Sequence, residues 1–167
     1  EHTEFHETLK LIELLKNETS MALVSDGGTP LVSDPGQLLV QKCRENDIEV
    51  IAIPGPSAAI AALTVSGLPT GNFYFQGFLH FKQNKRIHTL TNLKESFEKI
   101  ESKPTLIFYE APHRLLETLE DFKTVYGDIS IVVARELTKV HEEVWRGSIS
   151  EALIHFEHPK GEFVILF

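Results

Sequence analysis

The sequence has little cysteine, no long apolar run and a shortage of positive charge. The single cysteine, Cys43, cannot form an internal disulfide, so we expect a reducing compartment, namely the cytoplasm. No stretch approaches the roughly 20 apolar residues that span a bilayer, and we predict no membrane partner. With 16 Lys and Arg against 24 Asp and Glu, the net charge of -8 excludes a protein that coats nucleic acid by charge alone. Any contact with RNA must be local.

Two common nucleotide-binding motifs are also missing. The chain contains neither a GxxxxGK[ST] phosphate loop nor a GxGxxG motif with a later acidic partner, which lowers the rank of phosphate-rich ligands. His2 and His6 stand four residues apart, but no HExxH glutamate and no neighbouring cysteine accompanies them. We therefore predict no metal site.

Two glycine-bearing turns carry the main functional signal. Ser25–Pro30 follows the apolar run Met21–Val24, and Pro54–Ser57 follows the β-branched run Ile48–Ile53. Each run predicts a short strand, and a helical pattern follows each turn, as in α/β domains that bind a ligand at strand ends. Glycine allows positive φ and lets a ligand lie against bare backbone. Together the turns predict a ligand-binding crevice.

Apolar spacing predicts further elements. The start of the chain has the period of an amphipathic helix that ends near Lys16, and Asp34 with Pro35 is typical of the first residues of a helix that continues to about Asn46. The other expected elements are helices over 57–66, to about 100, 114–125 and 149–156, and strands over 73–78, 105–109, 129–134 and from 163 to the end. This alternation favours an α/β fold.

Proline and glycine cluster in the segment Gly67–Asn72. A helix or a strand rarely continues through residues of these types. We place a domain boundary there. The prediction is that residues 1–69 form the C-terminal part of a first α/β, cofactor-binding domain and that residues 70–167 form a second α/β domain.

Two charged segments of the second domain have two interpretations each. In the first segment, three cations are interleaved with aromatic rings: Lys82, Lys85 and Arg86, with Phe78, His80 and Phe81. The cations would either bind RNA phosphates while the rings stack on bases, or they would only keep a mobile loop soluble. The segment Arg135–Lys139, followed by Glu142 and Glu143, is either a solvated loop with weak ion pairs or a rim where Arg135 or Lys139 meets a polyanion.

Five motifs together resemble a known family. They are Ser25–Gly36, Pro54–Ala59, Ser66–Pro69, Phe108–Arg114 and Arg135–Lys139. In this order they resemble the tetrapyrrole methylase superfamily, and within it most the branch that methylates a cytidine 2′-oxygen in 16S ribosomal RNA. The resemblance covers nearly the whole chain.

The resemblance implies a two-domain class III methyltransferase fold, with S-adenosylmethionine between the domains and a homodimer as the assembly. It also implies an incomplete first domain, because the family's opening strand and its glycine loop have no counterpart here. The cofactor contacts that it implies are Gly27, Gly28, Thr29, Val32, Ser57, Ala58, Glu110 and Gly147.

The expected activity is therefore 2′-O-methylation of a cytidine ribose in 16S rRNA of the small ribosomal subunit, a step of rRNA processing. We expect RNA contacts from Lys82, Lys85, Arg86 and Arg135 and take Lys139 or Glu142 as the candidate base for the hydroxyl proton. Two alternatives stay open: C-methylation of a porphyrin or corrin precursor, and a fragment that binds cofactor or a partner domain without catalysis.

Overall fold

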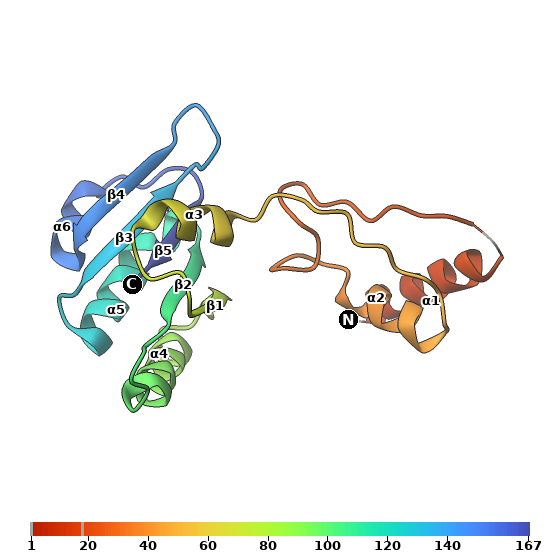
Figure 1. Ribbon diagram of the computed structural model, residues 1–167, viewed down its shortest axis with the longest axis horizontal. Coiled ribbons are helices and arrows are strands. Elements are labelled where there is room, and N and C mark those ends of the chain that lie inside the picture. Colours follow the sequence, from red (N-terminus) through yellow and green to blue (C-terminus); the bar gives the residue numbers. More distant parts are fainter. Residues whose placement is uncertain (1, 18) are drawn as a thin grey trace. The chain divides into compact units, whose positions relative to one another are not determined.

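The structure, a computed structural model, describes residues 2–17 and 19–167 and divides into two compact units, Glu1–Ser57 and Ala58–Phe167 (Figure 1). The predicted boundary at residues 69–70 lies beyond this division. Helix α3 (Ala58–Ser66), which we assigned to the first domain, packs on the sheet of the second unit. The predicted bounds thus remain a prediction for the domains of the intact protein. No helix in the described part of the chain combines the length and the apolar character that a membrane crossing requires.

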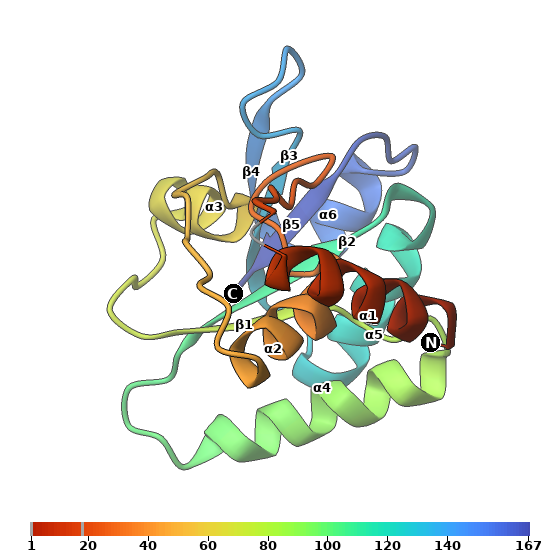
Figure 2. The ribbon, with the colours of Figure 1, turned by 90° about the vertical axis from the view of Figure 1, so that its right-hand side faces the viewer.

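The first unit contains two helices that pack against each other, α1 (His2–Lys16) and α2 (Gln37–Glu45) (Figure 2). The end of α1 at Lys16 and the end of α2 next to Asn46 confirm the predictions. The predicted cap at Asp34 is wrong, because α2 begins after Gly36 without a side-chain cap. Gly36 has a φ of +121°, which a residue with a Cβ rarely adopts.

The two strands predicted in the first unit do not form. Residues 21–24 and 48–53 have no regular secondary structure, and the side chains of Val24 and Ile53 are 81% and 79% exposed. A strand needs a hydrogen-bonded neighbour and a surface that covers its apolar face. Neither segment finds both among the described residues of this unit, so apolar, β-branched sequence alone was not enough.

The second unit is built on one mixed sheet. Its strands are β1 (Phe73–Phe78), β2 (Thr105–Glu110), β3 (Ser130–Arg135), β4 (Glu143–Ser148) and β5 (Phe163–Leu166), in the order β1-β2-β5-β3-β4. The β1–β2 pair is parallel and the other pairs are antiparallel. These are the predicted strands, with the addition of β4, which the prediction missed. β4 is an edge strand that contains Arg146 and Gly147, residues that obscure an apolar alternation.

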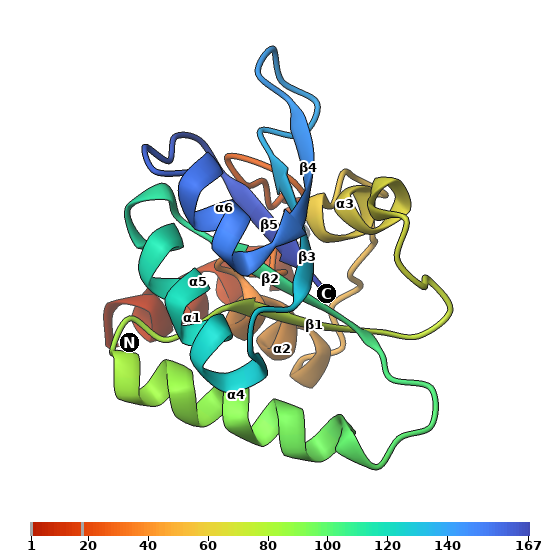
Figure 3. The ribbon, with the colours of Figure 1, turned by 90° about the vertical axis from the view of Figure 1, so that its left-hand side faces the viewer.

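Both faces of the three central strands, β2, β5 and β3, are buried, and their side chains alternate between the faces. Phe108 and Val133 face α4 (Gln83–Glu98), α5 (Leu115–Tyr126) and α6 (Ile149–His155), two of which, α5 and α6, lie on the viewer's side of the strands in Figure 3. Ile107 and Val132 face α3, whose alanines allow the helix to lie close to the sheet. All four of these helices were predicted, and a short 3-10 turn, η1 (Pro112–Arg114), precedes α5.

The carboxyl ends of β1, β2 and β3 lie at the same edge of the sheet, because β2 and β3 both run antiparallel to β5. The pairing Glu110–Phe163–Arg135–Glu143 marks this edge. We call it the carboxyl edge. In open α/β sheets this is where ligands bind. The loop that joins β3 to β4 extends outward from it (Figure 2).

Helix α3 is held at both ends by side chains from the sheet. The hydroxyl of Tyr109, on β2, accepts a hydrogen bond from the N–H of Ala59 at 3.0 Å. At the other end, Nε of Arg146, on β4, donates to the carbonyl of Ser66 at 3.0 Å, and Nη2 donates to the carbonyl of Val65. A cation at a helix C-terminus also interacts favourably with the helix dipole.

We predict that Arg146→Met lowers the free energy of unfolding of the second unit by about 1 kcal/mol, the usual net value of such hydrogen bonds at a partly exposed site. Arg146→Lys should lose less, because an ammonium retains the charge but cannot reach both carbonyls in the same geometry. Urea unfolding followed by the fluorescence of the single tryptophan, Trp145, measures both variants. Equal stability of Arg146→Met and the unaltered chain would contradict the anchoring role.

Candidate functional site

The two glycine-bearing turns of the first unit lie against each other. The hydroxyl of Thr29 donates a hydrogen bond to the carbonyl of Pro56 at 3.0 Å, across 27 residues of sequence. A Cβ added to Gly28 would lie 3.3 Å from the same carbonyl, and one added to Gly55 would lie 3.3 Å from Oγ1 of Thr29. The sequence predicted that these turns form a joint site, and the structure places them in contact.

The first turn presents bare backbone. Gly28 has a φ of +83°, and the hydroxyl of Ser25 donates to its carbonyl at 3.0 Å, which closes the turn. Apart from the two chain neighbours of Gly27, no atom of the described residues lies within 4 Å of the position where a Cβ on Gly27 would stand. Gly27 therefore borders open space, which is what a ligand that lies on backbone requires.

The segment after this turn is strained. Leu31 and Ser33 have φ values of +74° and +63°, a region that residues with a Cβ rarely adopt and that costs about 1–3 kcal/mol each. Val32, between them, is half exposed. Strain of this kind gathers at ligand-binding segments, so its position beside the paired turns agrees with a binding role.

Two further predicted cofactor contacts follow the second turn. Ser57 ends the first unit and Ala58 begins α3 in the second unit. Ser57 is half-buried and Ala58 is exposed. Both remain candidates, because they directly follow Pro56 in the sequence.

Glu110, a predicted cofactor contact, is buried within the second unit and already bonded. Its carboxylate accepts hydrogen bonds from the hydroxyl of Thr118 at 2.5 Å and from the N–H of Ala111 at 2.8 Å, and it pairs with Nη2 of Arg114 at 3.3 Å. A buried carboxylate needs such partners, since an unpaired charge in the interior is costly. In this structure Glu110 organises the carboxyl edge and does not face outward to a ligand.

Gly147, predicted to act with Glu110, lies elsewhere on the sheet. It pairs with Ile131, at the end opposite the carboxyl edge, and two strands separate β4 from β2. The spacing of strands and residues puts the two positions about 14 Å apart across the sheet and about 13 Å apart along it. A Cβ on Gly147 would collide with the ring of Trp145 at 2.5 Å. Internal packing therefore explains this glycine, and the structure does not bring it to Glu110.

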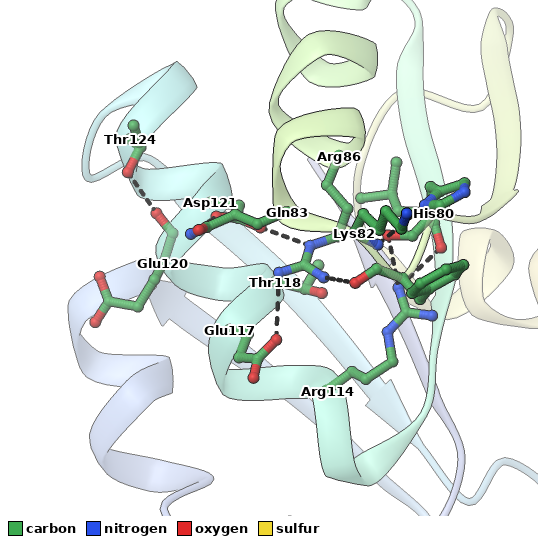
Figure 4. A network of polar contacts seen from close by, with 12 residues as sticks. His80, Lys82, Gln83, Arg86, Arg114, Glu117, Thr118, Glu120, Asp121 and Thr124 are labelled. Atoms are coloured by element: carbon green, nitrogen blue, oxygen red, sulfur yellow. Dashed lines mark hydrogen bonds and ion pairs between the residues drawn. The ribbon is translucent and has the colours of Figure 1, made fainter.

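Arg86, predicted to contact RNA, is only 1% exposed. Its Nε donates to Asp121 at 2.6 Å, its Nη1 to the carbonyl of Phe81 at 2.8 Å and its Nη2 to Glu117 at 3.3 Å. Figure 4 shows the guanidinium of Arg86 between α4 and α5, close to Asp121 and Glu117. Every guanidinium nitrogen has a protein partner, so we no longer assign a phosphate contact to Arg86.

Lys82 and Lys85, the other two cations of this segment, are exposed. Just before them, Nδ1 of His80 accepts a hydrogen bond from the N–H of Lys82 at 2.9 Å. Burial lowers the pKa of His80, and the charges of Lys85, Lys82 and Arg114 act in the same direction. The imidazole is therefore neutral at neutral pH, as an acceptor at Nδ1 must be.

The loop after β3 is held together by hydrogen bonds to the side chain of Glu136. Nζ of Lys139 bonds to Oε1 of Glu136 and to Oε2 of Glu162, both at 2.9 Å. These hydrogen bonds raise the pKa of Lys139, Glu136 having the larger effect. A lysine held in its charged form cannot accept a proton, so the structure argues against Lys139 as the base. The other candidate, Glu142, accepts a hydrogen bond from the N–H of Thr138 and remains an untested prediction.

Arg135, also predicted to contact RNA, lies at the carboxyl edge and pairs with Glu143 at 3.2 Å. Nε of Arg135 and Nε of Arg114 are buried and have no hydrogen-bond partner among the described residues. Buried unpaired donors are rare in folded proteins. Ordered water is a common partner of such donors in folded proteins.

The sequence interpretation missed three side chains that organise this edge: Arg114, Thr118 and Asp121. Glu110 ends β2, Arg114 ends η1 and Thr118 lies on α5, so no common helical face in the sequence signalled that these three side chains meet. Asp121 gave no signal either, because its partner Arg86 lies 35 residues away. Among the residues that the structure describes, no three His, Cys, Asp or Glu side chains gather as a metal site would require.

Comparisons with known proteins agree with these motifs. The family described as Tetrapyrrole (Corrin/Porphyrin) Methylases matches residues 1–153. The chain is similar to a protein of Synechocystis sp. named ribosomal RNA small subunit methyltransferase I, at 48% identity over 99% of this chain and 58% of the relative. The chain therefore spans somewhat over half the length of that relative.

Two solved structures share the fold. The methyltransferase CobJ has a TM-score of 0.69 at 18% identity, over 98% of this chain and 70% of that one. Uroporphyrin-III C-methyltransferase from Thermus thermophilus, complexed with S-adenosyl homocysteine, has a TM-score of 0.60 at 15% identity, over 98% of this chain and 73% of that one. At these identities the likeness shows the fold alone.

We predict that Asp121→Ala lowers the free energy of unfolding by about 3–5 kcal/mol, because it removes the buried counterion of Arg86 and leaves only the exposed carboxylate of Glu117 beside the charge. Glu117→Gln is the matched control: its carboxylate pairs with the same guanidinium but is 68% exposed, so the change should cost about 1 kcal/mol or less. Urea unfolding of both variants provides the comparison. Similar losses in the two would show that the Arg86–Asp121 pair is not the main anchor.

Proposed function

The chain belongs to the family of tetrapyrrole (corrin/porphyrin) methylases, and from this premise we propose that the intact protein is an S-adenosylmethionine-dependent methyltransferase that methylates a cytidine ribose 2′-oxygen in small-subunit ribosomal RNA. The 48% identity to a relative with a ribosomal RNA methyltransferase name supports RNA over a tetrapyrrole as the acceptor. We also propose a homodimer that acts in the cytoplasm.

The observation that carries the proposal is the contact between the two glycine-bearing turns. The Thr29–Pro56 hydrogen bond joins them, and Gly27 borders open space beside it. Backbone amides, carbonyls and small side chains suit the adenosine and amino-acid groups of S-adenosylmethionine, so the residues fit this cofactor. We assign its binding to Gly27, Gly28, Thr29 and Val32, together with Ser57 and Ala58. We assign no cofactor contact to Glu110 and Gly147, whose roles are to bond and to pack within the second unit.

When bound, S-adenosylmethionine supplies a methyl group on a positively charged sulfur. The ribose oxygen gains this methyl and loses its proton to solvent or to a nearby base, while the sulfur is left uncharged. The protein's part is to hold the hydroxyl in line with the methyl, and positioning of this kind supplies roughly 7–11 kcal/mol in favourable cases. Contact of the sulfonium with backbone and small side chains would replace water there, which disfavours the localised charge of the reactant relative to the dispersed charge of the transition state.

The test is transfer of labelled methyl from S-adenosylmethionine to assembled small ribosomal subunits, with a tetrapyrrole precursor as the competing acceptor. We expect label in RNA from subunits that lack the modification and none in subunits that already contain it. Label in the macrocycle would show that the acceptor is a tetrapyrrole and not RNA. Retention of the cofactor without transfer to either acceptor would favour a non-catalytic binding fragment.

We predict that Gly27→Val abolishes the binding of S-adenosylmethionine and leaves the protein folded, because the described residues beyond its chain neighbours leave room for an added Cβ, which would occupy the space that the ligand needs. Gly28→Val should also abolish binding, but by distorting the turn, since Gly28 has a φ of +83° and its new Cβ would crowd the carbonyl of Pro56. Calorimetry measures the affinity, and far-ultraviolet circular dichroism, to which α1 and α2 of the first unit contribute, measures whether the variants are folded. An unchanged affinity of Gly27→Val for S-adenosylmethionine would show that this turn is not part of the cofactor site.

A further inference from the structure

We propose that His80 and Phe81 form a stacking platform for an unpaired base of the substrate RNA, with Lys85 placed to meet an adjoining phosphate and with Nζ of Lys82 close to the platform, 5.7 Å from the centre of the Phe81 ring. The inference rests on the proposed function, because RNA is the acceptor assumed there. The inference specifies which part of the second unit contacts the RNA, and that the RNA is recognised as an unpaired strand.

The platform is an aromatic pair at the surface. The rings of His80 and Phe81 are stacked, with centroids 4.4 Å apart and an interplanar angle of 26°. Phe81 is 67% exposed, although a large apolar ring is normally buried. Base stacking on such rings is the common way in which proteins hold single-stranded RNA.

The loop that bears these rings is held firmly, which argues against the alternative of a mobile, merely solvated segment. Nη2 of Arg114 donates to the carbonyl of Leu79 at 2.8 Å and lies 3.5 Å from that of His80. Nη1 of Arg86 donates to the carbonyl of Phe81 at 2.8 Å. Two arginines thus bind three consecutive carbonyls. A surface that is already ordered loses little entropy when it binds.

The protonation state of His80 adds to this order. Its Nδ1 accepts the N–H of Lys82, so the ring is held in one tautomer and one orientation beneath Phe81. The ring pair is therefore a fixed feature of the surface.

The local distribution of charge around Phe81 favours a negatively charged partner such as RNA. The whole chain has a net charge of -8, yet residues 80–86 contain no acidic residue and expose Lys82 and Lys85. On the α5 side, Phe81 borders a hollow that Glu117 and Glu120 also line. Phosphates are repelled from that side, so the strand passes over the start of α4. An unpaired strand is required, because bases within a duplex are already stacked on each other.

The experiment compares the binding of two fluorescent single-stranded probes, an oligocytidine RNA and the same backbone with abasic sites. We expect Phe81→Leu to weaken the binding of the oligocytidine about 5- to 100-fold and to leave the abasic probe unaffected. Phe81→Trp should retain the affinity, because an indole also stacks. Lys85→Gln should weaken both probes alike and reduce the slope of log K against log salt by about 0.7.

The matched control is Phe73→Leu, which alters another exposed phenylalanine at the opposite end of β1 and should leave both probes unaffected. Because Phe81 is exposed, Phe81→Leu should unfold at the same urea concentration as the unaltered chain. Equal affinity of Phe81→Leu and the unaltered chain for oligocytidine, or an equal loss on both probes, overturns the platform. A change in oligomeric state without a change in base dependence also overturns it and identifies a contact between copies.

The failure of the platform and the failure of the proposed function give different results. If labelled methyl enters ribosomal RNA and Phe81→Leu binds oligocytidine normally, only the platform is wrong. If the unaltered chain binds neither probe and labels no RNA, the RNA acceptor is wrong and the platform falls with it.

Discussion

The buried ion pair between Arg86 and Asp121 is the interaction on which the geometry of the second unit's carboxyl edge depends. A charge in the protein interior must have a counterion, and the two partners are 1% exposed. Since Asp121 fixes one side of the guanidinium, the other side is directed at Glu117 and at the carbonyl of Phe81. One buried pair therefore sets the position of α4, of α5 and of the loop before α4.

A second arginine repeats this arrangement from the other side of the loop. Arg114 is held by the buried carboxylate of Glu110, which Thr118 and the N–H of Ala111 also bind, and it reaches the carbonyl of Leu79. Arginine is suited to this role because its fork of donors binds a carboxylate and a carbonyl at once. The residues that a cofactor or RNA role was predicted for, Glu110 and Arg86, instead hold the surface on which other side chains are displayed.

The two units contribute different chemistry to the proposed reaction. The first unit offers bare backbone at Gly27 and a strained, positive-φ segment through Ser33, both suited to contact with a small cofactor. The second unit offers fixed aromatic rings and exposed lysines, suited to a polyanion with unpaired bases. Methyl transfer to a hydroxyl depends mainly on placement, so the structure of the site needs few reactive side chains. This agrees with the finding that Lys139 is held in its charged form.

The sequence by itself determined the local elements and the site motifs: α3, β1, β2 and α5 follow from periodicity, and the glycine turns mark the candidate site. Only the tertiary structure decided that Thr29 meets Pro56, that Arg86 points inward, that Gly147 lies away from Glu110 and that residues 21–24 and 48–53 form no strand. The reason is physical. Periodicity reports which face of a segment is buried, and that is a local property, whereas ion pairs and strand ladders depend on a partner that lies far away along the chain.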